Sequence, residues 1–383
     1  SREGRRQRIA GVKQARAAAL ARERSAHEDP ALQARIDAYR ARTDRALAAL
    51  GAPRTVPWGC VLLTGATGYL GAYLLHALVT TRDCRIVAPV RGADQAGAER
   101  RLREVLDHYF GPAFHDLCTG RVEVVVADLG QPGLGMAPEV YRRLAAEVDT
   151  ILHSAANVSH YGPYEDFHRA NVVSTEQLLA LAVEDTPKRF HFVSTISISD
   201  GVPDAPWAVF TEDDIDIGQQ PGNVYIRSKL EAERIVAAFR ARGGVASIHR
   251  VGNITYHSRT GVLQKNIAEN AFYQRTRACL ALGMVPDYLD AAELTFVDRL
   301  AEAIVLLCEQ DALGNETFHL HNPHHVRLSA FLAESTEGLR IRGVPSDAFL
   351  DGLLAMRDAP EHADAVMNLL VHTGLLDEEA PKA

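Results

Sequence analysis

Cysteine is scarce in this chain, and long apolar runs are absent. The 383 residues include five cysteines, which are widely spaced and form no Cys-x-x-Cys pair. This pattern argues against a disulfide framework and against a zinc-binding motif. No apolar run approaches the ~18 residues that a membrane-spanning helix needs, and no secretory signal pattern opens the sequence. We therefore expect a cytoplasmic protein with reduced thiols, no membrane association and no metal site.

Lysine is also scarce, since only five of the 41 basic residues are lysine. The basic residues are unevenly spread: residues 1–54 hold 13 basic and 6 acidic residues, whereas the remainder holds 28 basic and 43 acidic ones. A nucleic-acid-binding arm is the alternative to a solvated helical linker for this basic segment. Because the segment lacks interleaved aromatic residues and the acidic body would repel phosphates, we expect a helical linker over 1–57 and no nucleic-acid partner.

The sequence does not begin with methionine but with Ser1-Arg2-Glu3. Two expectations fit this start equally well. The chain is either a domain excised from a longer polypeptide or a processed or tagged protein.

Strand-like and helix-like segments alternate after Pro57. Continuous apolar runs of strand length recur, and the segments between them show helical periodicity. Buried strands alternating with helices indicate a parallel sheet covered on both faces. We therefore predict a doubly wound, Rossmann-type α/β fold with a ligand crevice beyond the carboxyl ends of the strands. The expected strands are 60–65, 85–91, 122–128, 149–155, 189–195 and 246–251, and the expected helices include 68–80, 164–184 and 225–242.

This rhythm breaks near residue 256. We predict a long helix over 265–283, a strand running into a helix over 294–307, a late strand over 316–322 and a mostly helical tail from 323. A smaller, mostly helical C-terminal lobe accounts for these segments. The expected division is a dinucleotide-binding domain over 58–255 plus about 294–322, and a substrate-binding lobe over about 256–293 plus 323–383.

Three glycines connect the first expected strand to the helix that follows it. Gly65, Gly68 and Gly71 lie in the stretch LLTGATGYLGAYLL. Glycines at such a turn let the backbone approach a pyrophosphate, and the helix N-terminus offers N–H donors and positive potential. A purely structural turn is the alternative, but the strand–turn–helix context favours a dinucleotide site.

The end of the second expected strand indicates which dinucleotide is bound. An NAD-binding site usually places a carboxylate there, whereas this chain has Arg91, with Arg101 on the next helix. A guanidinium pairs with a 2′-phosphate that a carboxylate would repel, so we predict NADPH. The alternative is that both arginines are ordinary solvated residues. Asp128, after the third strand, either accepts a hydrogen bond from the adenine amino group or belongs to a turn.

Tyr225 and Lys229 stand four residues apart on an expected helix, so their side chains share one face. A phenol with the usual pKa of about 10 is a poor proton donor near neutrality, and a neighbouring ammonium lowers that pKa. An ammonium also offers a nicotinamide ribose three donors in a compact head, which the planar guanidinium does not match. The pair therefore predicts a proton donor tuned by lysine.

Other polar and small residues are expected around this pair. Thr195, in FVSTISIS at the end of the fifth strand, is positioned to hold the substrate carbonyl oxygen, and Ser197 is its rival. Asn171 either positions a water behind the lysine or bends its own helix. The stretch HSAAN, residues 153–157, offers small side chains where a cofactor passes close to the backbone.

Together these motifs resemble the extended short-chain dehydrogenases/reductases. They resemble more closely the thioester reductase domains that terminate nonribosomal peptide and polyketide synthases, to which domains of carboxylic acid reductases are related. The matching stretches lie within residues 58–325 and are TGATGYLG, PVRGA, HSAANVSHYGPYEDFHRANVVST, FVSTISI, YIRSKLEAE, RVGNI and TFVD. The resemblance implies Thr195, Tyr225 and Lys229 as the catalytic set. It implies cofactor contacts at Gly65, Thr67, Gly68, Tyr69, Leu70, Gly71, Arg91, Arg101, Asp128, Leu129, Ala155, Ala156, Asn157, Tyr225 and Lys229.

One stretch departs from the family pattern. After RVGNI the family has a Gly-Asp-Ser-like loop bordering the substrate channel, whereas this chain has Tyr256-His257-Ser258. The resemblance therefore does not extend to acyl-chain specificity.

The resemblance also implies an activity and a partner. An acyl or peptidyl chain, held as a phosphopantetheine thioester on a carrier protein of the same or a preceding polypeptide, is released by NADPH as an aldehyde. A second reduction would give a primary alcohol. The implied setting is a monomeric domain of a larger synthase, in antibiotic biosynthesis, with the carrier docking on the C-terminal lobe.

Two other functions remain as alternatives. A nucleotide-sugar epimerase or dehydratase would use the same catalytic residues, but such enzymes retain NAD, and Arg91 counts against that. A non-catalytic NADPH-sensing protein would not need the Tyr225–Lys229 pair.

Overall fold

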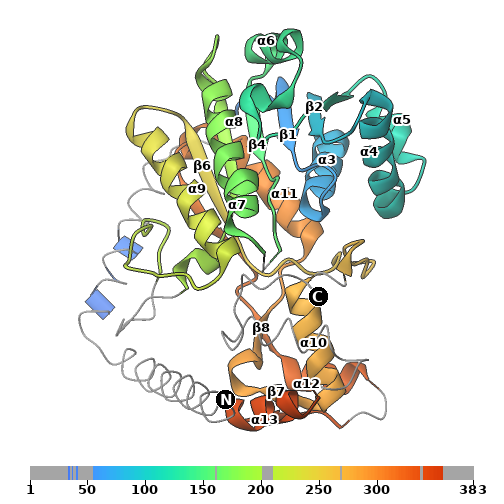
Figure 1. Cartoon of the computed structure of the whole chain (residues 1–383), viewed down its shortest axis with the longest axis vertical. Helices are drawn as coiled ribbons and strands as arrows, with labels where there is room; N and C mark the ends of the chain where they lie inside the picture. The colour runs from blue at the N-terminus through green and yellow to red at the C-terminus, as the bar shows by residue number, and fades with distance from the viewer. Residues whose placement is uncertain are drawn as a thin grey trace.

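The computed structural model describes residues 55–356, apart from 160–161, 201–209, 268–269 and 337–339, together with residues 33–34, 37 and 40–41. Most of the expected linker over 1–57 therefore lies outside the described residues, as does the chain after 356. The described residues form a large sheet-containing part and a smaller part beside it (Figure 1).

A seven-stranded, wholly parallel sheet forms the centre of the larger part. The strands are β1 (Cys60–Thr64), β2 (Arg85–Val90), β3 (Val122–Val126), β4 (Thr150–His153), β5 (Arg189–Thr195), β6 (Ala246–Val251) and β9 (Thr317–Leu320). Their order, β3-β2-β1-β4-β5-β6-β9, starts in the middle and builds outward to both edges. This order confirms the predicted doubly wound fold and brings the carboxyl ends of the strands to one edge.

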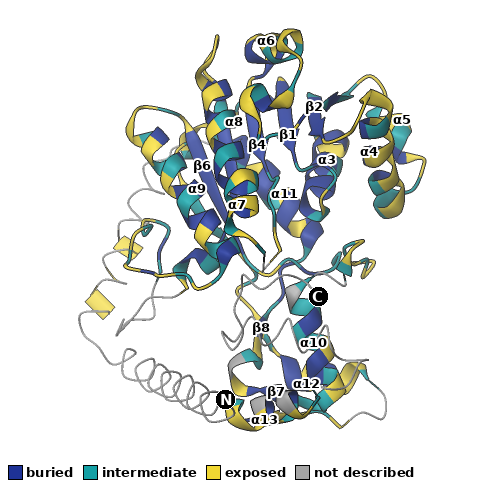
Figure 2. Cartoon of the chain, viewed as in Figure 1, coloured by how far each residue is buried: buried dark blue, intermediate teal, exposed yellow. Residues whose placement is uncertain are grey.

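Helices cover both faces of this sheet because successive strand residues point to opposite sides. One apolar core contains Val61 and Leu63 of β1, and the other contains Cys60 and Leu62. Figure 2 shows the strands and the inner sides of the helices as buried. The first core is covered by α3 (Tyr69–Thr81), α4 (Gln95–Phe110), α5 (Phe114–Cys118) and α11 (Val297–Cys308), and the second by α6 (Pro138–Glu147), α8 (Ser174–Val183) and α9 (Val224–Ala241).

The smaller part has its own apolar core, which is built from residues between 272 and 356. It contains two two-stranded sheets, one pairing β10 with β8 and the other pairing β11 with β7. Its elements are α10 (Ala271–Leu282), β7 (Met284–Pro286), β8 (Ala291–Glu293), β10 (His325–Arg327), α12 (Leu328–Ser335), β11 (Arg342–Val344) and α13 (Ser346–Met356).

Short helical segments complete the described chain. The predicted helix over 164–184 is present, but a π-helical turn interrupts it at His168–Val173. Such turns frequently occur at functional sites. The remaining segments are α7 (Tyr164–Phe167) and 3-10 turns at Pro132–Gly135, Ile196–Ser199, Asp287–Leu289 and Asp311–Leu313.

Two boundaries differ from the prediction. The helix expected over 265–283 begins only at Ala271, because the Asn270 side chain accepts a hydrogen bond from the Tyr273 N–H and caps the helix there. The strand expected at the start of 294–307 lies earlier, as β8 at Ala291–Glu293. Thr295 instead makes an isolated bridge to Ile254, since the chain turns into the helix within two residues.

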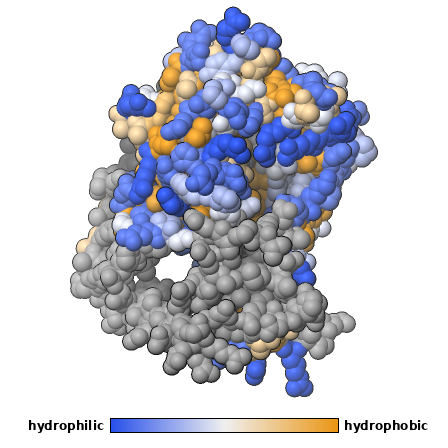
Figure 3. Space-filling view, viewed as in Figure 1, coloured by the Kyte–Doolittle hydropathy of each residue, from blue (hydrophilic) through white to orange (hydrophobic). Residues whose placement is uncertain are grey.

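Within the described part of the chain, no helix is both long enough and apolar enough to cross a membrane. The face seen in Figure 3 mixes polar and apolar residues over the larger part.

Packing of α11 against the sheet and α3 should contribute strongly to stability. Ile304 on α11 is fully buried in the first core, so Ile304→Ala should lower the free energy of unfolding by about 2–5 kcal/mol. Leu306 on the same helix is 52% exposed, so Leu306→Ala should change the free energy of unfolding by less than about 0.5 kcal/mol. Urea denaturation measures both, and equal losses would contradict this packing.

Candidate active site

The glycine turn after β1 has a shape that only glycine permits. Gly65 has a φ of +77°, and a Cβ there would lie 2.7 Å from the Ala155 nitrogen. A Cβ on Gly71 would lie 2.0 Å from the Gly65 carbonyl oxygen. The glycines therefore let β1, the β4 end and α3 approach one another closely. Gly68 precedes α3, and no side chain caps the N–H groups of the first turn of α3. These N–H groups can therefore bind a phosphate, so the turn fits a dinucleotide.

Tyr69, the first residue of α3, uses its side chain to hold a neighbouring loop. Its hydroxyl donates to the carbonyls of Thr255 and Val262, at 2.8 and 3.0 Å. Its ring packs 5.5 Å from the rings of Tyr73 and Tyr109. The phenol thus anchors the loop after β6. The backbone of Tyr69 is the part left to contact a cofactor.

The loop that departs from the family pattern is held on the other side by α11. The Ser258 hydroxyl donates to Asp298 at 2.6 Å, and its backbone N–H donates to the same carboxylate at 2.8 Å. The His257 ring lies 5.7 Å from that of Tyr73. The Tyr-His-Ser sequence is therefore compatible with an ordered loop beside the glycine turn.

Arg91 and Arg101 lie together beyond the end of β2. Both are exposed, and the Arg101 guanidinium donates to the Arg91 carbonyl at 3.3 Å. Asp128 is exposed as well, and its carboxylate accepts a hydrogen bond from the Gly130 N–H at 3.3 Å, as a turn residue does. Leu129 packs against the second core. The proposed 2′-phosphate and adenine contacts remain predictions.

Asn171 ties the turn after β4 to α9. Its amide oxygen accepts from the Asn157 N–H at 2.6 Å, and its amide nitrogen donates to the Asn157 carbonyl at 3.1 Å and to the Ser228 hydroxyl at 2.8 Å. Asn171 is 1% exposed and lies in the π-helical turn. The side chain is therefore a clamp that sets the distance between Ala155–Asn157 and the helix carrying Tyr225.

A buried histidine joins β1 and β4 below this turn. His153 Nδ1 lies 2.8 Å from the Thr64 hydroxyl and Nε2 lies 3.2 Å from the Thr175 hydroxyl. The Thr175 hydroxyl donates its own proton to the Asn171 carbonyl at 2.7 Å, so it accepts from Nε2, and Nδ1 accepts from the Thr64 hydroxyl. Burial lowers the pKa of His153 to about 3, so the ring is neutral.

Thr195 and Tyr225 come together at the carboxyl end of β5. Asn223 caps α9 by accepting from the Tyr225 N–H at 2.9 Å, which places Tyr225 in the first turn of the helix. A hydrogen bond joins the side chains of Thr195 and Tyr225. The Thr195 hydroxyl also accepts from the Ser197 N–H at 3.2 Å, so Ser197 contributes its backbone to the same turn. The expected contact of Thr195 with a substrate carbonyl stays a prediction.

Lys229 lies one turn further along α9. Its Nζ donates to the Val193 carbonyl at 2.6 Å and lies 4.0 Å from the centre of the Phe192 ring. Burial lowers the pKa of Lys229 to about 7, and the Glu233 carboxylate opposes that shift.

The expected lowering of the Tyr225 pKa is wrong for this structure. Burial raises the pKa of Tyr225 to about 12, opposed by the hydrogen bond from Thr195. Desolvation is the main cause, while the Lys229 amine is bonded to the Val193 carbonyl and its charged form is itself disfavoured by burial.

Sequence reasoning missed the ion pair beneath Lys229. Glu233 and Arg250 are both fully buried and are joined at 2.5 and 2.9 Å. The Ser194 hydroxyl donates to the other Glu233 oxygen at 2.6 Å. The i, i+4 spacing from Lys229 to Glu233 was visible in the sequence, but the partner comes from β6 and only the fold supplies it.

Arg250 also fixes the segment that leads into α9. Its guanidinium donates to the carbonyls of Thr211 and Asp214 at 3.1 and 2.5 Å, and it lies 4.6 Å from the centre of the Phe210 ring. One buried guanidinium therefore connects β6, α9 and the chain before the helix.

Comparison with known proteins supports this reading of the site. The family model described as male sterility protein, an NAD-binding family, matches residues 63–304. The chain belongs to this family. The match runs from β1 into α11, so it includes the glycine turn, Thr195, Tyr225 and Lys229. A nicotinamide dinucleotide is the cofactor that this family assignment supports.

Two relatives of this chain are parts of synthases. It is 33% identical over 294 residues to a component of the linear gramicidin synthase of Brevibacillus parabrevis, covering 76% of this chain and 6% of that protein. It is 34% identical over 275 residues to an isonitrile lipopeptide synthase of Streptomyces coeruleorubidus, covering 70% of this chain and 18% of that protein. The chain thus spans less than a quarter of the length of these two relatives.

A solved structure is similar over most of both chains. The terminal R domain from the myxalamid PKS-NRPS biosynthetic pathway superposes with a TM-score of 0.73 at 33% identity, covering 83% of this chain and 80% of that one.

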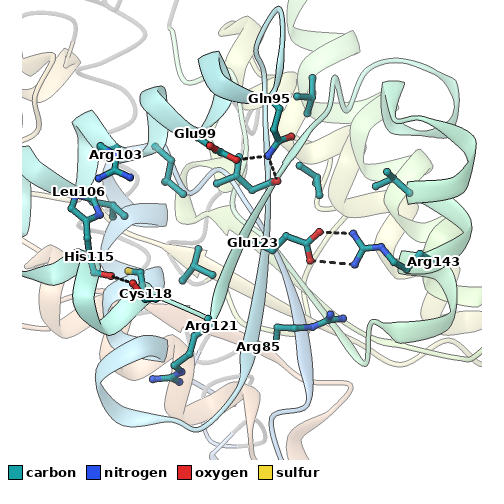
Figure 4. A pocket seen from close by; sticks show the side chains of 18 of the residues that line it. Arg85, Gln95, Glu99, Arg103, Leu106, His115, Cys118, Arg121, Glu123 and Arg143 are labelled. Carbon is teal, nitrogen blue, oxygen red and sulfur yellow. Dashed lines mark hydrogen bonds and ion pairs between the residues drawn. The ribbon is translucent and has the colours of Figure 1, made fainter.

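A further cavity, of about 860 Å³, lies away from this site along the edge strand β3 (Figure 4). Gln95 donates to the Val124 carbonyl there at 2.7 Å, and Arg143 pairs with Glu123 at 2.5 Å. No residue of the candidate catalytic set lines it.

Replacing Lys229 by methionine should stabilise the protein most at or below pH 7, and progressively less as the pH rises toward 10.5. The pKa of Lys229 is about 7 when folded and has the ordinary value of 10.5 when unfolded. Between these pH values the unfolded state holds more protons, so the wild type gains about 1.4 kcal/mol of stability per pH unit that the variant lacks.

Urea unfolding at pH 7 and pH 9 measures this difference. Lys265 is exposed, so Lys265→Met should show no comparable change with pH. A Lys229→Met effect that is the same at both pH values would contradict the buried, neutralised lysine.

Proposed function

We propose that this chain releases an acyl or peptidyl group from a carrier-protein phosphopantetheine thioester by NADPH-dependent reduction. The observation that carries the proposal is the hydrogen bond between Thr195 and Tyr225 at the end of β5. It lies at the same sheet edge as the glycine turn, with Lys229 one helical turn away. The R-domain likeness and the synthase relatives support this substrate class.

The residues that would hold the cofactor surround this edge. Gly65, Gly68 and Gly71 admit the pyrophosphate, and Ala155 and Ala156 leave room beside them. Arg91 and Arg101, exposed and adjacent, supply the positive charge that a ribose 2′-phosphate requires. When bound, NADPH supplies the hydride that reduces the thioester carbon.

The chain's own residues handle the oxygen and the proton. Because its pKa is raised to about 12, Tyr225 stays protonated at neutral pH and acts as a hydrogen-bond donor. Tyr225 and Thr195 together hold the substrate oxygen where negative charge develops, and Tyr225 gives it a proton. Loss of the thiol from the resulting hemithioacetal leaves an aldehyde, which the same hydroxyls can hold for a second reduction to a primary alcohol.

Lys229 is the group that can resupply this proton. A pKa of about 7 lets the amine gain and lose a proton at neutral pH, and the Asn171 clamp fixes the helix that carries it. The buried Glu233–Arg250 pair holds that same helix against β6.

The smaller part, whose core lies between residues 272 and 356, is proposed to receive the acyl chain and the carrier. Carrier proteins are usually acidic, which makes basic residues near the crevice the candidate contacts. Arg299 is exposed beside the loop after β6, although it pairs with Glu302 at 2.9 Å. Arg275 and Arg277 on α10 are the other candidates.

Tyr225→Phe should lower kcat for a model acyl thioester by about 10²–10³-fold, because the proton donor and one oxyanion contact are lost together. NADPH absorbance decay measures the rate. Tyr141→Phe removes a phenol that bonds Glu184 on the second face of the sheet, and it should retain the wild-type rate. A wild-type rate from Tyr225→Phe would refute the mechanism, and turnover of a nucleotide sugar in place of the thioester would refute the substrate class.

Arg91→Ala and Arg101→Ala should each raise KM for NADPH by about tenfold while leaving KM for NADH unchanged, because a charged hydrogen bond to the 2′-phosphate is worth about 1.5–3 kcal/mol. Arg100→Ala alters a neighbouring exposed arginine on α4 and should change neither value. Steady-state kinetics with NADPH and with NADH measure these KM values. A preference of the wild type for NADH would contradict the proposed NADPH specificity.

A further inference from the structure

Two histidines and a cysteine meet inside the first core, away from the candidate active site. His191 of β5, His249 of β6 and Cys308, the last residue of α11, are each at most 1% exposed. One ligand atom from each lies within 4.8 Å of the others. Three elements far apart in the sequence thus converge on one small volume.

The imidazoles lack the partners that buried polar groups normally have. Both ring nitrogens of His191 and Nδ1 of His249 have no hydrogen-bond partner among the described residues. Each such atom costs about 1–3 kcal/mol, and apolar side chains of similar size would avoid that cost. Burial lowers the pKa of His249 to about 3 and that of His191 well below its ordinary value, so both rings are neutral and keep a lone pair.

One separation within this cluster suits two ligands that share a metal ion. Cys308 Sγ lies 3.7 Å from His249 Nε2. An ion bonded at about 2.3 Å to sulfur and about 2.0–2.1 Å to nitrogen would hold the two at about 3.6–3.8 Å in tetrahedral or trigonal geometry. Thiolate and imidazole are the ligands that copper and zinc prefer.

Charge favours a monovalent ion. The described cluster contains no carboxylate, and the Arg189 guanidinium donates to the Cys308 carbonyl at 2.8 Å. A divalent ion with one thiolate would leave a net positive charge buried beside that guanidinium, which is costly. A monovalent ion with one thiolate is neutral, and thiolate is a soft ligand that selects Cu⁺.

We propose that His191, His249 and Cys308 bind one Cu⁺ ion and thereby pin the end of α11 to β5 and β6. Binding forms a metal–sulfur bond, and the thiol proton is released to solvent. His191 precedes Thr195 by four residues on β5, a separation of about 13 Å along the strand, so the ion takes no part in the thioester chemistry. The widely spaced ligands form no sequence motif, which is why the cysteine pattern alone predicts no metal site.

The test is an anaerobic titration of the full 383-residue chain with Cu⁺ in competition with a chromogenic Cu⁺ chelator. The ion is offered to the native chain and also during refolding from urea, so that burial does not limit entry. We expect one ion retained per chain, one proton released in weak buffer and a thermal midpoint raised by several degrees. Cys308→Ala should weaken retention by about 100-fold or more, since even outer partners of metal ligands are worth 10–100-fold.

Controls separate this site from other thiols and from misfolding. Cys279→Ala removes another fully buried thiol, in the smaller part, and should keep wild-type retention. If Cys308→Ala fails to fold, His191→Phe replaces a ligand by an apolar ring of similar size. Equal retention by wild type and both ligand variants would overturn the proposal, and preferential retention of Zn²⁺ in a parallel titration would overturn the monovalent assignment.

Discussion

A single buried ion pair underlies the arrangement of the candidate active site. Glu233 and Arg250 have no solvent exposure, and between them they connect β6, α9 and the segment before α9. Losing either partner would leave an uncompensated charge in the core, at a cost of about 3–5 kcal/mol. The helix that carries Tyr225 and Lys229 is therefore fixed by a buried ion pair.

Further hydrogen bonds hold both sides of α9 near this pair. The Ser194 hydroxyl donates to the Glu233 carboxylate. The Lys229 amine donates to the carbonyl of Val193, the residue before Ser194. On the other side, Asn171 connects Ser228 to Asn157. Side chains bonded on several sides have few alternative rotamers, so these groups are held in place by the protein itself.

Burial shapes the chemistry of this edge more than direct charge–charge contact does. Desolvation moves the pKa of Lys229 down to about 7 and that of Tyr225 up to about 12. The two shifts leave a protonated phenol beside an amine that titrates near neutrality. Pairs of groups whose environments drive their pKa values apart are typical of acid–base sites.

The sequence by itself determined the alternation of strands and helices, the glycine turn and the positions of Thr195, Tyr225 and Lys229. These features are local, because strand burial, turn geometry and i, i+4 spacing are written in neighbouring residues. Only the tertiary structure decided that Lys229 bonds Val193, that Tyr69 anchors the loop after β6, and that Arg250 neutralises Glu233. These contacts join residues up to 193 positions apart, and desolvation depends on everything packed around a group, so no local pattern encodes them.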